Sequence, residues 1–332
     1  MTSTESRAVG ALYGLAIGDA LGMPTQSLPR ARIVALYGEV VDGLHPAPDD
    51  QPLAAGMPAG AITDDTEQAI LLGRLVVEGN GLVDGHELAR RLLAWEDDMR
   101  ARGSLDLLGP STKRALDALL AGGDIKETGR YGTTNGAAMR ITPVGIASTP
   151  DLLLDRVIAA SAPTHNTGLA LAAAAAVAAA VSAGVDGATV REATSAAAVA
   201  AREAAAYGYW VAGGDVSRRI EWAVTALAAH GEAAPGPGAA AELVYELVGT
   251  SLAAQESVPA AFAVANGFGD PWDVVRVAAS VGGDTDTIAA IAGAVVGACH
   301  GVDAFPADVR RTVSEVNRLD LEGLAVELLM VR

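Results

Sequence analysis

The sequence has one cysteine, few aromatic residues and little positive charge. The single Cys299 excludes an intramolecular disulfide and a zinc site built from several thiolates. Aromatic residues make up 4% of the chain, and no Val-, Ile- and Thr-rich run alternates with polar residues, so the composition argues against β-strands. Lysine and arginine number 23 against 40 aspartates and glutamates, a net charge of −17. So acidic a surface excludes general binding to nucleic-acid phosphates and anchoring to anionic lipid.

The N-terminal residues MTSTESRAVG lack the basic segment and apolar run of a secretory signal. Together with the lone cysteine, which suits a reducing compartment, this predicts a cytoplasmic protein. One uncharged stretch, from Gly168 to Val185, is long enough to be compared with a membrane span. It is rich in alanine, which forms helices readily but has little drive into lipid, so a buried helix is the better interpretation.

The remaining composition predicts a folded, helical chain. Of the 332 residues 51% are hydrophobic and 19% charged, which excludes disorder. Hydrophobic residues recur at helical spacing, and alternating strand–helix units are absent. Helices are expected at residues 5–22, 30–37, 64–79, 84–101, 110–121, 136–139, 151–160, 166–183, 188–206, 215–230, 239–254, 256–266, 271–280, 285–300, 306–318 and 320–331. Loops at 45–60 and 232–238 border no change in composition, so we predict an all-α fold with one domain over residues 1–332.

Glycines repeat at every fourth position in two of these helices. The first stripe is Gly10, Gly14, Gly18 and Gly22, and the second is Gly293, Gly297 and Gly301. Residues at this spacing share one helix face, where glycine is less favourable than alanine by up to about 1 kcal/mol. Close approach of neighbouring helices would offset that cost. Simple composition bias, in a chain with 38 glycines, is the alternative.

Two acidic clusters open predicted helices. They are Ile62-Thr63-Asp64-Asp65-Thr66-Glu67 and Gly282-Gly283-Asp284-Thr285-Asp286-Thr287. Each alone is explained by helix capping, with Thr63 or Asp64 as N-cap and Glu67 completing a capping box. Together they offer only oxygen donors, which suit a hard cation such as Mg²⁺, Mn²⁺ or Ca²⁺. Neither has the spacing of an EF-hand loop. If the clusters meet, two cations about 3.5–4 Å apart would compensate their charge.

Five segments in order resemble the ADP-ribosylglycohydrolase family, which includes the dinitrogenase-reductase-activating glycohydrolases, the eukaryotic ADP-ribosyl hydrolases and the J1-crystallins. The segments are GALYGLAIGDALGMPTQ from Gly10, ITDDT from Ile62, TNGAAMRITPVG from Thr134, SAPTHN from Ser161 and GGDTDTIAAIAGAVVGACHG from Gly282. The resemblance implies a compact, single-domain orthogonal helical bundle with a binuclear Mg²⁺ (or Mn²⁺) centre. The ligands it implies are Thr63, Asp64, Asp65, Asp284, Asp286 and Thr287.

The resemblance also implies cleavage of the anomeric bond of an ADP-ribosyl conjugate by metal-assisted attack of water. Asp65, Asp284 and Asp286 are the candidate catalytic residues, because carboxylates beside the ions can position that water. Candidate substrate-binding residues are Gln26, Asn135, Gly136, Met139, Arg140, His165, Gly282 and Gly283. Alternatives stay open for three positions: Arg140 pairs a phosphate or a structural carboxylate, His165 donates to a ligand or caps the next helix, and Asp19 orients a metal ligand or is a satisfied buried acid.

One departure from the family concerns Gln26, where many members carry an acidic residue. An amide positions a group but cannot act as a general base. Another carboxylate then serves, the activity differs, or activity is lost. Asp106 is a doubtful match to a family aspartate because its spacing to the next glycine differs.

Two other functions remain as alternatives. One is hydrolysis of a free nucleoside, nucleotide or sugar glycoside, and the other is a non-catalytic, ligand-binding or crystallin-like protein. The expected partner is an ADP-ribose-containing or ribosyl substrate, either a small molecule or a protein. Nucleic acid is expected only as an ADP-ribosylated substrate, and no membrane partner is expected.

Overall fold

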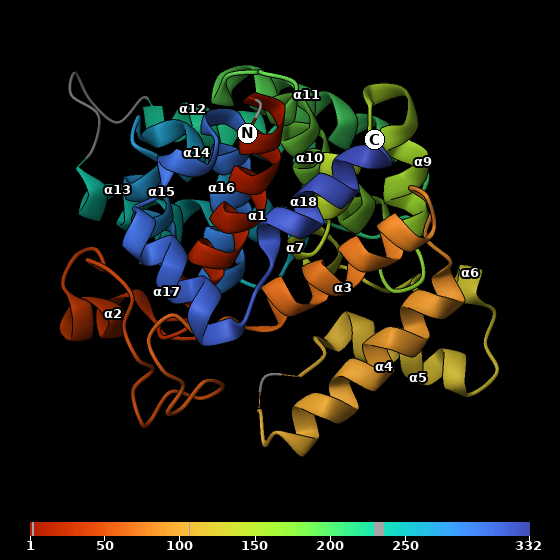
Figure 1. Ribbon diagram of the computed structural model, residues 1–332, viewed down its shortest axis with the longest axis horizontal. Helices are drawn as coiled ribbons and strands as arrows, with labels where there is room; N and C mark the ends of the chain where they lie inside the picture. The colour runs from red at the N-terminus through yellow and green to blue at the C-terminus, as the bar shows by residue number, and fades with distance from the viewer. Residues whose placement is uncertain (2, 106, 229–235) are drawn as a thin grey trace.

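The computed structural model describes residues 1, 3–105, 107–228 and 236–332, and in this part of the chain it contains helices but no β-strand. Helix accounts for 67% of the protein. Long helices pack around a central group formed by α1, α10 and α16, and α4 and α5 lie to one side beyond α3 (Figure 1). The all-α prediction is therefore confirmed.

Most helices follow one another with short connections, and a long loop joins α2 to α3. In chain order they are α1 (Ser3–Gly22), α2 (Arg30–Tyr37), α3 (Asp64–Glu78), α4 (Gly85–Ala101), α5 (Pro110–Leu120), α6 (Ile125–Thr128), α7 (Gly136–Met139), α8 (Thr142–Ala147), α9 (Pro150–Ser161), α10 (Gly168–Val185), α11 (Val190–Ala204), α12 (Val216–Ala228), α13 (Pro237–Leu243), α14 (Ala254–Gly267), α15 (Pro271–Ala278), α16 (Thr285–His300), α17 (Ala307–Asn317) and α18 (Leu321–Met330). A π-helical turn, η1 (Val244–Val248), follows α13, and a 3₁₀ turn, η2 (Val302–Ala304), follows α16.

The prediction of one helix over 239–254 was wrong. The segment consists of α13 and η1, which stop at Gly249, where φ is 90°. That left-handed conformation suits glycine and ends the helix. The next residues instead pair with distant backbone: the amide of Asp284 donates to the carbonyl of Thr250 at 2.8 Å. The predicted loop at 232–238 lies partly outside the described residues.

Both glycine stripes face a closely packed helix, as the spacing predicted, and the structure shows that the first stripe packs on the second. A Cβ at Gly14 would lie 2.0 Å from the carbonyl oxygen of Gly293, and one at Gly10 would lie 2.5 Å from that of Gly297. At the other end of α1, a Cβ at Gly22 would lie 2.3 Å from the Cα of Asp286. The backbones of α1 and α16 therefore touch along most of their length, and this contact fixes the start of α16 against the end of α1.

The alanine-rich helix α10 is long and apolar enough to cross a membrane. In this structure 83% of its 18 residues are buried among other helices. Small side chains let α8, α9, α11 and α16 pack closely around it. It serves as a central core helix here, in agreement with the sequence.

Candidate active site

The two acidic clusters meet, although 222 residues separate the side chains that join them. The hydroxyl of Thr287, in the first turn of α16, donates to Asp65 Oδ2 at 3.0 Å. Asp65 lies in the first turn of α3 and is fully buried. Because α1 packs on both helices, it holds their first turns in one place.

Asp19 on α1 fixes the start of α3. Its carboxylate accepts hydrogen bonds from the backbone N–H of Thr63 at 3.0 Å, from the Thr63 hydroxyl at 2.7 Å and from the backbone N–H of Thr66 at 3.1 Å. Burial raises the pKa of Asp19 to about 6, against the lowering effect of these donors. Asp19 thus supports the neighbouring acidic turn and does not line a cavity.

Helix capping explains only part of the two clusters. Thr63 is the N-cap of α3, where its hydroxyl accepts from the backbone N–H of Asp65 at 3.4 Å. Asp284 holds the corresponding position of α16, but its side chain makes no capping bond. It accepts instead from the amide of Asn135. The carboxylate of Asp284 is thereby directed toward the loop before α7.

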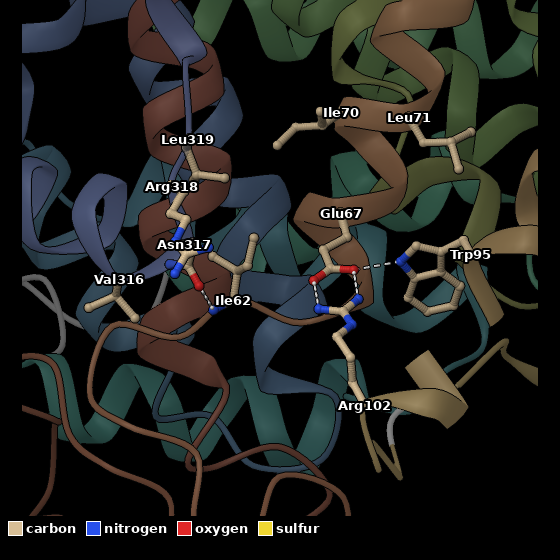
Figure 2. Close-up of a pocket in the computed structure, with 10 residues that line it drawn as sticks. All are labelled: Ile62, Glu67, Ile70, Leu71, Trp95, Arg102, Val316, Asn317, Arg318 and Leu319. Atoms are coloured by element: carbon tan, nitrogen blue, oxygen red, sulfur yellow. Dashed lines mark hydrogen bonds and ion pairs between the residues drawn. The ribbon is translucent and has the colours of Figure 1, made fainter. Parts of the chain in front are cut away.

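The predicted capping box at Glu67 is absent, because this side chain turns to the other face of α3. Figure 2 shows the Glu67 carboxylate between the guanidinium of Arg102 and the indole of Trp95. Arg102 Nη1 donates to Glu67 Oε1 at 3.1 Å, and Trp95 Nε1 donates to Glu67 Oε2 at 2.6 Å. A cavity of about 530 Å³ opens beside these groups. The only carboxylate lining it in the described chain is already paired, so it is a poor place for carboxylate catalysis.

Burial and mutual repulsion raise the pKa values of carboxylates in the acidic clusters. The pKa of Asp65 lies well above its usual range, first because the side chain is buried and then because Asp286, Asp64, Asp19 and Asp284 surround it. Burial raises the pKa of Asp284 to about 6, and hydrogen bonds from Asn135 and Thr287 partly oppose this. Divalent cations would relieve this repulsion by neutralising the carboxylates.

A cavity of about 260 Å³ opens directly onto these carboxylates. Its lining includes both clusters and the loops that follow α1, precede α5 and precede α7. The lining residues are Gln26, Ser27, Leu53, Asp64, Leu105, Leu107, Leu108, Gly109, Pro110, Thr112, Thr134, Asn135, Gly136, Met139, Leu252, Asp284, Asp286 and Thr287. We call it the carboxylate cavity. Of the predicted ligands, Thr63 and Asp65 lie behind its wall.

Gln26 lines the carboxylate cavity, with 3% of its surface exposed, and its amide nitrogen has no hydrogen-bond partner among the described residues. The backbone around it is well held. Its carbonyl accepts from Gln51 Nε2 at 2.8 Å. The amide of the next residue, Ser27, donates to the carbonyl of Gly283 at 2.7 Å. Ser27 itself has a φ of 59°, which is uncommon for a residue other than glycine.

Arg140 was predicted to contact the substrate, but it is fully buried away from the carboxylate cavity. Its guanidinium donates to Gln68 Oε1 at 3.1 Å and to the Thr164 hydroxyl at 2.6 Å. Gln68 Nε2 in turn donates to Asp64 Oδ2 at 2.9 Å. Arg140 therefore acts on the acidic cluster through Gln68, since α3 and α7 stand between it and the cavity. Burial lowers its pKa to about 10, which leaves it charged at neutral pH.

His165 is likewise buried and does not reach the carboxylate cavity. Its Nε2 lies 3.0 Å from the hydroxyl of Thr134, and its Nδ1 lies 2.8 Å from that of Thr164. Burial, and then the charge of Arg140, hold its pKa well below the usual range, so the ring is neutral. It positions Thr134, which does line the cavity. Neither Arg140 nor His165 lines the carboxylate cavity, because sequence spacing gives the helix face but not what covers it.

The remaining predicted residues divide between two cavities. Asn135, Gly136 and Met139 line the carboxylate cavity. Gly283 lines a neighbouring pocket, and Gly282 packs beneath the ring of Tyr245. Three polar residues that line the cavity were not predicted from the sequence: Ser27, Thr112 and Thr134. Gln68, which hydrogen-bonds to Asp64, was not predicted either. Thr134 opens a matched segment and was within reach of the sequence, whereas Gln68 and Thr112 carried no signal.

The oxygen donors around the carboxylate cavity are carboxylates, hydroxyls and amides, the ligand types that hard cations prefer. In the described residues no group of three or more His, Cys, Asp or Glu side chains is already arranged around a metal-sized space. Rotation of Asp64, Asp284 or Asp286 would be required to close such a shell. Asp106, the other acid considered from the sequence, lies outside the described residues.

The chain is similar to known proteins over its whole length. The sequence model of a family described as ADP-ribosylglycohydrolase matches residues 1–332. The chain is 36% identical over 330 residues to the protein YegU of Escherichia coli (strain K12), which covers 98% of this chain and 97% of that one. It is 28% identical over 307 residues to the ADP-ribosylarginine hydrolase Tri1 of Pseudomonas putida (strain GB-1), covering 90% and 72%. A solved structure titled ADP-ribosylglycohydrolase-related protein complex superposes with a TM-score of 0.72 and 25% identity, covering 100% of this chain and 99% of that chain.

Proposed function

Because the chain belongs to the ADP-ribosylglycohydrolase family, whose members are glycosidases, we propose that it hydrolyses the anomeric bond of a cytoplasmic ADP-ribosyl conjugate at the carboxylate cavity, with two Mg²⁺ or Mn²⁺ ions. The conjugate is a modified protein side chain or a related ADP-ribose derivative. The main support is the hydrogen bond between Thr287 and Asp65, because it joins the two acidic clusters at the floor of one cavity.

The residues present fit a pair of hard cations. The ions would be held from the cavity wall by Asp64, Asp284, Asp286 and Thr287. Asp65 would add its negative charge from behind that wall. Bound ions would chelate a ribose diol and acidify a water molecule. The raised pKa of Asp65 is consistent with this assignment, since burial and then the neighbouring carboxylates disfavour its charge, and cations would offset both effects.

The carboxylates have different roles in the proposed reaction, according to their position. Asp284 and Asp286 line the cavity and can reach a water molecule there, whereas Asp65 lies behind Thr287. We assign to Asp284 or Asp286 the proton that the attacking water loses. The water oxygen bonds to the anomeric carbon as the bond to the leaving group breaks, and the leaving group departs with that electron pair and takes up a proton. Asn135 keeps the Asp284 carboxylate pointed toward the reaction.

The decisive experiment is a release assay with a panel of conjugates, with and without EDTA. The panel is ADP-ribosyl-arginine, ADP-ribosyl-serine, O-acetyl-ADP-ribose and simple nucleosides. We expect ADP-ribose to be released, EDTA to abolish the release, and added Mg²⁺ or Mn²⁺ to restore it. Cleavage of nucleosides alone would instead establish the free-nucleoside alternative. Absence of turnover, together with no saturable uptake of Mg²⁺ in calorimetry, would establish a non-catalytic protein.

A further inference from the structure

A second pocket adjoins the carboxylate cavity. Its volume is about 470 Å³, and Ser27, Leu28, Pro29, Tyr245, Leu252 and Asp284 are among its lining residues. Ser27, Leu252 and Asp284 line both spaces, so the two cavities are adjacent and the Asp284 carboxylate lies at their boundary. We call the second space the Tyr245 pocket. A substrate with its anomeric carbon at the carboxylates can extend into it.

The walls of the Tyr245 pocket are held by backbone contacts. The amide of Gly283 donates to the carbonyl of Leu28 at 2.9 Å, and the amide of Asp284 donates to the carbonyl of Thr250 at 2.8 Å. Tyr245 belongs to the π-turn η1, and its ring lies so close to Gly282 that a Cβ there would be 3.0 Å from it. The site is therefore preformed, with an aromatic ring on one side. Short π-helical segments are frequent at functional sites.

The charge of this pocket argues against ionic ligands. Asp284 is the single charged side chain among the described residues that line it, and it already accepts from Asn135. A diphosphate would meet this carboxylate without any lysine or arginine to offset it. A guanidinium, which only donates hydrogen bonds, would find no further carboxylate to accept them. The apolar walls and the Tyr245 ring favour a neutral, flat group.

Gln26 lines the carboxylate cavity, and the next residue, Ser27, lines both spaces. The amide nitrogen of Gln26 is buried without a hydrogen-bond partner among the described residues, which is unfavourable, and an acceptor on a bound ligand would satisfy it. A carbonyl conjugated to the breaking bond is such an acceptor, because negative charge accumulates on its oxygen as the leaving group departs. An amide donor stabilises that charge, whereas a glutamate at the same place would repel it while ionised.

We infer that Gln26 and the Tyr245 pocket form a leaving-group subsite for a neutral, planar, carbonyl-bearing heterocycle joined through nitrogen to the anomeric carbon. This rests on the proposed function and narrows its substrate class. Water supplies the oxygen that bonds to the anomeric carbon, and the carbon–nitrogen bond breaks with its electron pair on the heterocycle. The heterocycle takes up a proton and leaves as the free base, while a cavity carboxylate accepts the proton lost by water.

The test compares Gln26→Met with the wild type, since methionine keeps the length of glutamine but donates no hydrogen bond. We expect kcat/KM for inosine, uridine or their ADP-ribosyl analogues to fall by about 10-fold or more, mainly through kcat. Tyr245→Leu should weaken binding of these substrates and raise KM. Tyr207→Leu is the matched control, because Tyr207 is an exposed tyrosine outside both spaces.

Binding of the free leaving groups gives a readout that does not need turnover. Hypoxanthine or uracil should bind the Mg²⁺-loaded wild type more tightly than methylguanidine does, and Gln26→Met and Tyr245→Leu should each remove that preference. If no conjugate is cleaved but this preference is found, the proposed function fails and the subsite stands. If methylguanidine binds as tightly, or ADP-ribosyl-arginine is the preferred substrate and Gln26→Met leaves its kcat unchanged, the subsite is overturned.

Discussion

Among single residues, the carboxylates of the site are held where burial and mutual repulsion penalise their charge. Asp65 is the extreme case, fully buried and surrounded by four other acids. Asp19 is also fully buried but has four donors from Thr63 and Thr66. Asp19 is therefore compensated by the protein itself, whereas Asp65 would be compensated by the proposed cations.

Replacing Asp65 should separate activity from stability. Asp65→Asn removes a carboxylate from a repulsive cluster, so we expect the Tm of the metal-free protein to rise by a few degrees. Hydrolysis should fall at least about 100-fold, because the ions lose a ligand. Thermal melts and initial rates check both, with the exposed Asp49→Asn as control. A variant that kept wild-type rates would contradict the placement of the metal site.

The raised pKa values predict how magnesium stabilisation depends on pH. Asp19 and Asp284 have folded pKa values of about 6 against an ordinary 3.8, so protonation favours the folded state. That contribution is complete below about pH 4 and is lost as the pH rises through about 6. Metal-free protein should therefore lose stability over this interval, and Mg²⁺ should restore it.

We accordingly expect the rise in Tm caused by Mg²⁺ to be several degrees at pH 7.5 and much smaller at pH 5. Melts with KCl at equal ionic strength control for general screening. An equal effect of Mg²⁺ at both pH values would show that these carboxylates are not linked to the ion.

Gln68 connects buried Arg140 to Asp64 and should tune the metal site without touching the substrate. Gln68→Met keeps the volume but removes both hydrogen bonds. Affinity for Mg²⁺ should fall by about 10–100-fold, the usual effect of losing a group that orients a ligand. Calorimetric titration measures it. If affinity is unchanged while Tm falls, Gln68 has only a structural role.

Between helices, the contact of α1 with α16 determines where the site forms. A Cβ at Gly18 would lie 2.0 Å from the carbonyl oxygen of Ala289, a backbone atom that cannot move aside. Gly18→Ala should therefore lower the free energy of unfolding by about 3 kcal/mol, despite alanine's better helix propensity. Gly43→Ala is the matched control, because no atom lies within 4 Å of its Cβ position. Denaturant unfolding tests this, and equal stability of both variants would contradict it.

For the whole molecule, the net charge of −17 is a global source of repulsion. Screening by monovalent salt should raise the Tm of the metal-free protein between about 0.02 and 0.3 M KCl. The increase should be smaller in the presence of Mg²⁺, since the ions already neutralise the most concentrated negative charge. A Tm that falls with salt would mean that attractive ion pairs dominate the surface.

The sequence alone determined the helical class, the close approach of helices at the two glycine stripes and the identity of the two acidic clusters. Each of these depends on short-range spacing: glycines four apart share a face, and acids at a helix start share a turn. The same information misplaced Arg140 and Glu67, which point to partners on other helices, and His165, which lies between the hydroxyls of Thr134 and Thr164.

Only the tertiary structure decided which side of each helix is covered. Packing of α1 on α16 brings Thr287 to Asp65, and pairing of Leu28 with Gly283 places Ser27, the residue after Gln26, between two cavities. These contacts join residues more than two hundred positions apart, so no local propensity specifies them. The sequence shows which reactive residue types the site contains. Their geometry is set by close packing between segments that are far apart in the sequence.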